Sequence, residues 1–177
     1  MILRGWALTA HGAAAEGIAL MRQGLGAYNA MGAALGRPYF LALLAAAYGA
    51  VSQAEAGLRV LAGALAGVNK NGEHGVTAEL YRLQGELLLL SAGRQDEAEV
   101  CLRRAFKVAC HQNAKLWKLR AAVSLCRLWQ HHGKQAVGRP MLAAACTAFT
   151  EGFATADLQE AQAVLSTSMS TLSFPEC

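Results

Sequence analysis

Small and large apolar residues recur along this chain with a period of about 40 residues. Two series of small residues keep that period, and each is followed by a series of large apolar residues, three positions after the first and four after the second. Because two helices cross closely only where a side chain is small, each unit is predicted to be a helical hairpin. The small residues are Gly5, Ala45, Gly85 and Cys126, then Gly17, Gly57, Ala98 and Gly138, and the large ones are Leu8, Tyr48, Leu88 and Trp129, then Met21, Leu61, Leu102 and Leu142.

The predicted fold is all-α: a right-handed α-solenoid of four helical hairpins followed by a capping helix that begins after Thr155. Pro140 would interrupt a helix interior, so the last hairpin helix is predicted to begin near Arg139 and end near Thr150. One extra residue in the third unit, between Gly85 and Gly93, should lengthen a helix end or a turn. The expected segments are hairpins at 1–33, 36–71, 76–113 and 114–151, a cap at 155–165 and a flexible tail at 166–177.

Composition agrees with a helical chain that has a large core. Apolar residues make up 54% of the 177 residues and charged residues 16%, which excludes a disordered chain. The longest uncharged apolar run, residues 39–51, is well short of the roughly 20 residues that span a membrane. The first residues form no signal peptide. Cytoplasmic residence, no membrane partner and reduced cysteines are therefore expected.

Catalytic and metal-binding patterns are not found in the sequence. It has no phosphate-binding loop, and its only aspartates, Asp96 and Asp157, belong to separate turns. His131 and His132 beside Cys126 could suggest a metal site, but adjacent helical residues point in different directions. We therefore expect no enzyme activity, no metal and no cofactor.

Positive charge is concentrated in the second half of the chain. Between Val100 and Thr150 there are nine Lys or Arg residues and no Asp or Glu. This segment could attract nucleic acid or an acidic partner. We favour a solvated outer surface, because no aromatic residues appear interleaved with the charges.

The third unit resembles a tetratricopeptide repeat. Tyr81, Gly85 and Leu88 are followed by Ala98 and Leu102 at the spacing of that motif, without its closing proline and with a period longer than its 34 residues. Residues 36–49, 78–89, 119–134 and 149–165 are similar to the tetratricopeptide-type C-terminal region of bacterial signalling ATPase and nucleotide-cyclase regulatory proteins. The resemblance implies a scaffold for protein interactions in signal transduction, and a chain that can be part of a longer protein.

The resemblance also implies that the first helix of each hairpin lines a concave face. A groove there could hold an extended or helical peptide that carries an acidic group. Alternatively, the charges on residues 79–86 form only an ion-pair ladder within one helix. The exposed first hairpin could pair with a second copy of the chain. The candidate binding residues are Trp6, Tyr39, Glu79, Arg82, Glu86, Arg120, Arg127 and Gln130.

Overall fold

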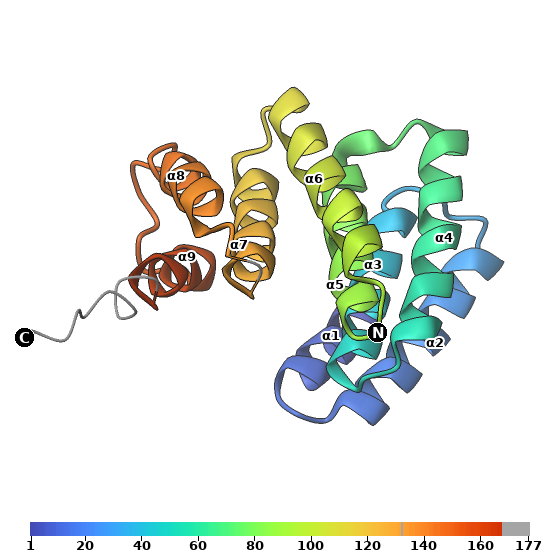
Figure 1. The fold of residues 1–177 in the computed structure, drawn as a ribbon. Helices are drawn as coiled ribbons and strands as arrows, with labels where there is room; N and C mark the ends of the chain where they lie inside the picture. Colours follow the sequence, from blue (N-terminus) through green and yellow to red (C-terminus); the bar gives the residue numbers. More distant parts are fainter. Residues whose placement is uncertain (132, 168–177) are drawn as a thin grey trace, which may run out of the picture.

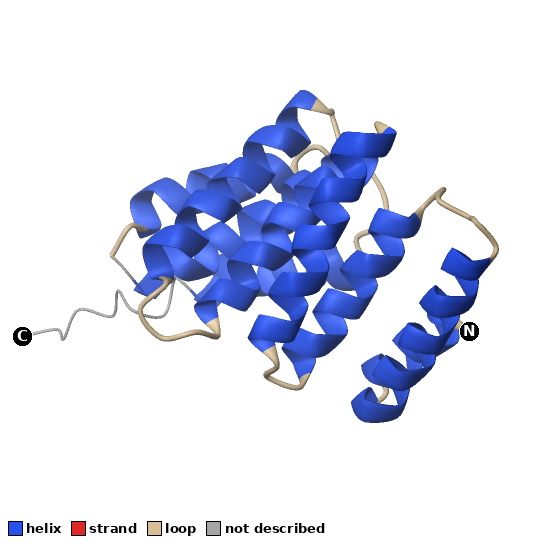
Figure 2. Cartoon of the chain, turned by 90° about the vertical axis from the view of Figure 1, so that its right-hand side faces the viewer, coloured by secondary structure: helices blue, strands red, loops and turns tan. Residues whose placement is uncertain are grey.

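The computed structural model describes residues 1–131 and 133–167, and only the backbone of Asn71 and His131. This part of the chain is all-α, as predicted, and Figure 2 shows helices and loops throughout it. The α-helices are α1 (Ile2–Ala10), α2 (Ala14–Ala30), α3 (Arg37–Ala50), α4 (Ala54–Asn71), α5 (Thr77–Leu89), α6 (Gln95–His111), α7 (Lys115–His131), α8 (Gln135–Cys146) and α9 (Ala156–Thr167), with a 3-10 turn at His74–Val76.

Consecutive helices pack as pairs, and the pairs follow one another in chain order (Figure 1). The pairs are α1 with α2, α3 with α4, α5 with α6, and α7 with α8. The odd-numbered helices also contact one another in sequence, from α1 through α3, α5 and α7 to α9. They therefore form one row along the molecule, and a side chain on one of them can reach a side chain on the next.

Each pair of helices crosses where the small residues of the repeat meet. A Cβ atom added to Gly85 would lie 3.1 Å from the Ala98 carbonyl oxygen and 2.6 Å from Cγ of Leu102. One added to Gly57 would lie 3.2 Å from the carbonyl oxygen of Ala45. The same approach joins Gly5 to Gly17 and Cys126 to Gly138. Backbones this close leave no room for a larger side chain.

The extra residue of the third unit lies in a turn. Helix α5 ends four residues after Gly85, whereas α3 ends five residues after Ala45. The connection that follows α5, residues 90–94, is longer than residues 51–53 after α3. Gly93 adopts a φ of +78°, a left-handed conformation that glycine enters without steric penalty.

Both predicted bounds of the last hairpin helix, near Arg139 and near Thr150, were wrong. Helix α8 begins at Gln135, contains Pro140 and ends at Cys146. Proline in the middle of this helix removes a single backbone hydrogen bond, and its ring is exposed, so the helix continues. Leu142 and Ala145 are fully buried and hold the helix in place.

The capping helix extends beyond its predicted end at residue 165, because α9 continues to Thr167. The hydroxyl groups of Ser166 and Thr167 donate to the carbonyl oxygens of Gln162 and Ala163, one turn earlier. Thr155 directly precedes α9, and its hydroxyl donates to the Gly152 carbonyl oxygen at 2.7 Å. Residues 168–177 of the expected tail lie outside the described residues.

The apolar core consists of two large clusters joined by a small one. One cluster combines buried residues of α1 to α5, and the other combines those of α7, α8 and α9. Between them, Leu102 of α6 packs with Leu125, Leu128 and Trp129 of α7. The buried alanines Ala98, Ala105 and Ala109 of α6 also belong to the core.

Glu99 reinforces the α6–α7 boundary with polar contacts. Its carboxylate accepts hydrogen bonds from Nε1 of Trp129 at 2.8 Å and from Nζ of Lys134 at 3.2 Å, and it pairs with Arg103 at 2.7 Å. Burial raises the pKa of Glu99, but the hydrogen bonds from Trp129 and Lys134 and the charge of Arg103 outweigh it, so the pKa lies below its usual value. The charged form of Glu99 thus stabilises the fold.

Gly85→Val should destabilise the fold, because the new side chain would overlap Leu102. We expect a loss of about 1–3 kcal/mol in the free energy of unfolding, measured by urea denaturation. Gly63→Val is the matched control, since a Cβ atom at Gly63 of α4 meets nothing within 4 Å. Equal stabilities of the two variants would contradict the close crossing.

Stability should depend on pH through Glu99. Because its pKa is lower in the folded chain, its contribution is present above the unfolded pKa of about 4.3 and is lost as pH falls through the folded value. Glu99→Gln should therefore be less stable than the parent at pH 7, and the difference should shrink below about pH 5. Thermal melts across this pH range measure the effect. Glu16→Gln, at an exposed site, should leave the profile of the parent unchanged.

Candidate binding site on the odd-numbered helices

Arg82 of α5 lies at the centre of a buried charge cluster. Its Nε and Nη2 atoms donate to both carboxylate oxygens of Glu79 at 2.7 Å each, and Nη1 donates to Oε1 of Glu86 at 2.5 Å. Only 13% of the Arg82 side chain and 8% of the Glu79 side chain are exposed. Burial lowers the pKa of Arg82, but the hydrogen bonds and charges of the two glutamates outweigh it and raise the pKa. The guanidinium therefore stays charged.

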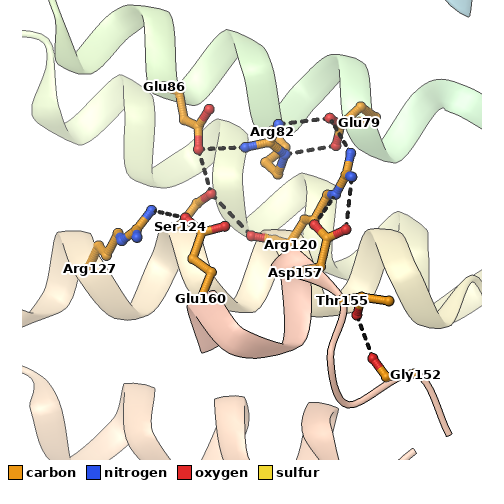
Figure 3. Close-up of polar contacts among 10 residues, drawn as sticks. All are labelled: Glu79, Arg82, Glu86, Arg120, Ser124, Arg127, Gly152, Thr155, Asp157 and Glu160. Carbon is orange, nitrogen blue, oxygen red and sulfur yellow. Dashed lines mark hydrogen bonds and ion pairs between the residues drawn. The ribbon is translucent and has the colours of Figure 1, made fainter. Parts of the chain in front are cut away.

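Arg120 of α7 connects this cluster to the last helix. Its Nε and Nη2 atoms donate to the two carboxylate oxygens of Asp157 on α9, at 2.5 and 3.0 Å, and Nη1 lies 3.5 Å from Oε1 of Glu79. The Asp157 hydrogen bonds raise the pKa of Arg120, although its burial opposes them. Figure 3 shows the resulting chain of contacts from α5 across α7 to α9.

Ser124 and Arg127 extend the cluster along α7. The Ser124 hydroxyl lies 2.8 Å from Oε1 of Glu86 and 3.1 Å from the Arg120 carbonyl oxygen, and the residue is buried. Nη1 of Arg127 pairs with Oε1 of Glu160 at 2.5 Å, nearer to solvent (Figure 3). The sequence interpretation missed Ser124, Asp157 and Glu160. The spacing of Ser124 four residues after Arg120, and of Asp157 three before Glu160, was the available signal.

Two adjoining hollows follow the row of odd-numbered helices. The first, of about 230 Å³, lies among the charged side chains of Arg82, Glu86, Arg120, Arg127, Asp157 and Glu160. The second, of about 320 Å³, lies between α3 and α5 and is lined by Ala46, Gly49, Ala50, Leu83, Leu87 and Leu90. Arg82 and Glu86 border both hollows, so an apolar and a charged compartment share one wall.

The structure does not bring all the predicted binding residues together. Trp6 on α1 and Tyr39 on α3 are half-exposed but line neither hollow. The Tyr39 ring instead lies against Phe40, with ring centres 6.0 Å apart. Gln130 donates through Nε2 to the Val164 carbonyl oxygen at 3.2 Å, so it contacts α9. The hollows are lined by α3, α5, α7 and α9.

Several cations of the basic segment, residues 100–150, pair with carboxylates in the folded chain. Arg103 and Lys134 pair with Glu99, Arg120 with Asp157, and Arg127 with Glu160. These carboxylates come from outside residues 100–150, which is why the sequence count did not include them.

Aromatic rings do accompany the charges, contrary to the expectation from the sequence. Arg104 lies over the Tyr81 ring at 4.2 Å, Lys118 over Phe106 at 5.9 Å and Arg103 over Trp129 at 5.6 Å. Each of these rings is thus partly covered by a cation of the same chain, an arrangement that stabilises the surface.

Two further sequence interpretations can be compared with residues 1–131 and 133–167. Within them, no three His, Cys, Asp or Glu residues group as a metal site would require. Cys126 packs at the crossing of α7 and α8, where burial raises the pKa of its thiol. The side chain of His131 and all of His132 lie outside the described residues. No helix in the described part is long and apolar enough to cross a membrane.

Comparison of the chain with protein-family models, curated proteins and solved structures gave no match.

Arg82→Met should destabilise the chain more than an ordinary surface substitution. The change leaves Glu79 buried with a single, longer contact to Arg120, and losing one partner of a buried pair costs about 3–5 kcal/mol. Glu79→Met with Arg82→Met should recover part of that loss, because the buried carboxylate is removed together with its partner. Glu86 also loses Arg82, but its side chain is 39% exposed and keeps the hydrogen bond from Ser124.

Urea denaturation of both variants measures the difference. Arg127→Met is the control: its ion pair with Glu160 is half-exposed, so a loss of at most about 1 kcal/mol is expected. If Arg82→Met cost no more than Arg127→Met, the buried network would not stabilise the fold.

Proposed function

We propose that this chain is a non-catalytic interaction scaffold that binds a peptide segment of a partner protein along its odd-numbered helices. In this proposal the helix pairs form a right-handed α-solenoid of four tetratricopeptide-like hairpins, and α9 caps the last one. The pairwise packing and the row from α1 to α9 support that architecture. The observation that carries the function is the pair of adjoining hollows, apolar and charged, on this row.

The apolar hollow follows from the repeat itself. In each unit, the residue directly after the small crossing residue of the first helix occupies an equivalent position. On α1, α3, α5 and α7 these residues are Trp6, Ala46, Glu86 and Arg127. Only α3 has a small residue there, and Gly49 and Ala50 continue the gap along the same helix. A large side chain from a partner can fill this space, as anchor residues do at protein interfaces.

The polar groups of the site favour recognition over chemistry. Arg82, Arg120 and Ser124 are held by contacts within the chain, and the Ser124 hydroxyl is buried between Glu86 and the α7 backbone. Such a network positions its members rigidly, which lowers the entropy lost when a partner binds. A rigid, prearranged surface is what a scaffold requires.

The wider setting rests on the resemblance of the repeat to bacterial regulatory proteins. We place the chain in cytoplasmic signal transduction, as one part of an assembly or of a longer protein. Nucleic-acid binding by the basic half is the weaker candidate, because four of its cations are paired with carboxylates.

Self-association through the first hairpin stays a prediction. Met1 and Leu3 at the start of the chain and Met31 after α2 are exposed apolar side chains that line one hollow. Exposed apolar residues grouped in this way are typical of contact surfaces. The molecular mass in solution would decide whether two copies pair.

Selection from a phage library of random peptides on the intact chain tests the proposed function. We expect binding peptides to be recovered, and Ala46→Trp to weaken their binding by at least about tenfold, because the new ring would fill the apolar hollow. Ala62→Trp, the same substitution at an exposed position of α4, should leave binding unchanged.

Circular dichroism and thermal melts would establish that both tryptophan variants fold as the parent does. Recovery of no peptide, or equal binding by the two variants, would contradict a binding site on the odd-numbered helices.

A further inference from the structure

The ion-pair network around the charged hollow has one more carboxylate than guanidinium groups. The hollow itself is lined by three arginines and three acids, Arg82, Arg120, Arg127, Glu86, Asp157 and Glu160. Glu79, which pairs with Arg82 and Arg120 but does not line the hollow, adds a fourth acid, so the network has a net charge of −1. The whole chain has a net charge of +4, so this network is a local exception. An anion entering it would raise the negative charge, whereas a single cation would bring the cluster to neutrality.

The hydrogen bonds within the cluster favour a cation as well. Arg82 directs three N–H groups at Glu79 and Glu86, and Arg120 places two on Asp157. A carboxylate from a partner would have to displace an acid that already binds these arginines. The guanidinium groups are thus already engaged by the chain's own carboxylates.

Two carboxylate oxygens, in contrast, remain open. Glu86 receives both Arg82 and Ser124 on Oε1, and Glu160 receives Arg127 on Oε1. Among the residues that the structure describes, neither Oε2 atom accepts a hydrogen bond. The two side chains are 39% and 44% exposed and line the same hollow.

We propose that the site recognises a peptide in which a bulky apolar side chain is followed or preceded at short range by Lys or Arg. The apolar side chain fills the hollow beside Ala46 and Gly49, and the cation enters the next hollow and binds Oε2 of Glu86 and Glu160. This inference rests on the proposed function, because it assigns the chemistry of the peptide that the scaffold would bind.

The shared wall of the two hollows sets the spacing of the two peptide residues. Both compartments border Arg82 and Glu86, so the two side chains must leave the peptide on one side and close together. An extended peptide meets this condition with residues two apart, and a helical one with residues three or four apart. Spacing is therefore a second property by which bound peptides can be recognised.

The test uses the peptides recovered from the random library with the intact chain. We expect an aromatic or large aliphatic residue at this spacing from a Lys or Arg, and affinity that falls as salt is raised. Replacing the cation by Gln in a synthetic copy should weaken binding by at least about tenfold in a fluorescence-polarisation titration. Replacing it by Glu should weaken binding further.

Variants of the chain give the reciprocal result. Glu86→Gln with Glu160→Gln should lose at least about tenfold in affinity for the Lys peptide and little for its Gln copy. Glu160→Lys, at a half-exposed site, should bind the Glu copy more tightly than the parent chain does. Glu55→Gln, at an exposed site on α4, serves as the control and should change nothing.

The two proposals fail in different ways. Peptides whose binding is abolished by Ala46→Trp but which lack a cation, or carry an acid in its place, would overturn this inference and leave the scaffold function standing. Peptides that bind the double glutamine variant as tightly as the parent would overturn it too. Recovery of no peptide would overturn the scaffold function, and this inference with it.

Discussion

The close crossing of two helices at a pair of small residues is the constraint from which the rest of the structure follows. At Gly85 and Ala98, as at Gly5 and Gly17, the backbones approach until no additional carbon fits. This approach fixes how each helix lies against its neighbour. It also fixes which side of each odd-numbered helix faces the next odd-numbered helix. The hollows and the charges around them are consequences of that placement.

The buried charges then add to what apolar packing supplies. The large apolar clusters of α1–α5 and α7–α9 are separate from the small cluster formed by Leu102 of α6 with Leu125, Leu128 and Trp129 of α7. Beside the charged hollow, Glu79 pairs with both Arg82 and Arg120, and Asp157 of α9 pairs with Arg120. On α6, Glu99 accepts hydrogen bonds from Trp129 and Lys134. Because each of these carboxylates accepts several N–H groups, the contacts between α5, α6, α7 and α9 are fixed by polar as well as apolar interactions.

The all-α class and the helix crossings were predictable from the sequence because small residues at a helix crossing leave a periodic signal. The small residues of the two series meet where α1 crosses α2, α3 crosses α4, α5 crosses α6 and α7 crosses α8. Helix α8 was misjudged at Pro140, where burial of Leu142 and Ala145 outweighs the loss of one backbone hydrogen bond. A local rule about proline could not include that tertiary contribution.

The site was predictable only in part, because two of its acids, Asp157 and Glu160, lie outside the repeat. The spacing of Glu79, Arg82 and Glu86 placed them on one helix face, and the ion pairs among them are present. The sequence did not reveal the partners of Arg120 and Arg127, because Asp157 and Glu160 belong to α9, and the repeat does not fix the position of α9 relative to α7. Pairing between distant segments is visible only in three dimensions. Here it changes the expected charge of the bound peptide from acidic to basic.

Nuclear magnetic resonance of the methyl groups tests the central claim most directly, which is that the odd-numbered helices form a peptide-binding surface. The chain would be labelled at Ala, Leu and Val and titrated with a library-selected peptide. The account predicts that the methyl signals of Ala46, Leu83 and Leu90 shift as the complex forms, while those of Val60 on α4 and Val100 on α6 do not. Shifts confined to α4 and α6, with the signals of Ala46 and Leu83 unchanged, would contradict it.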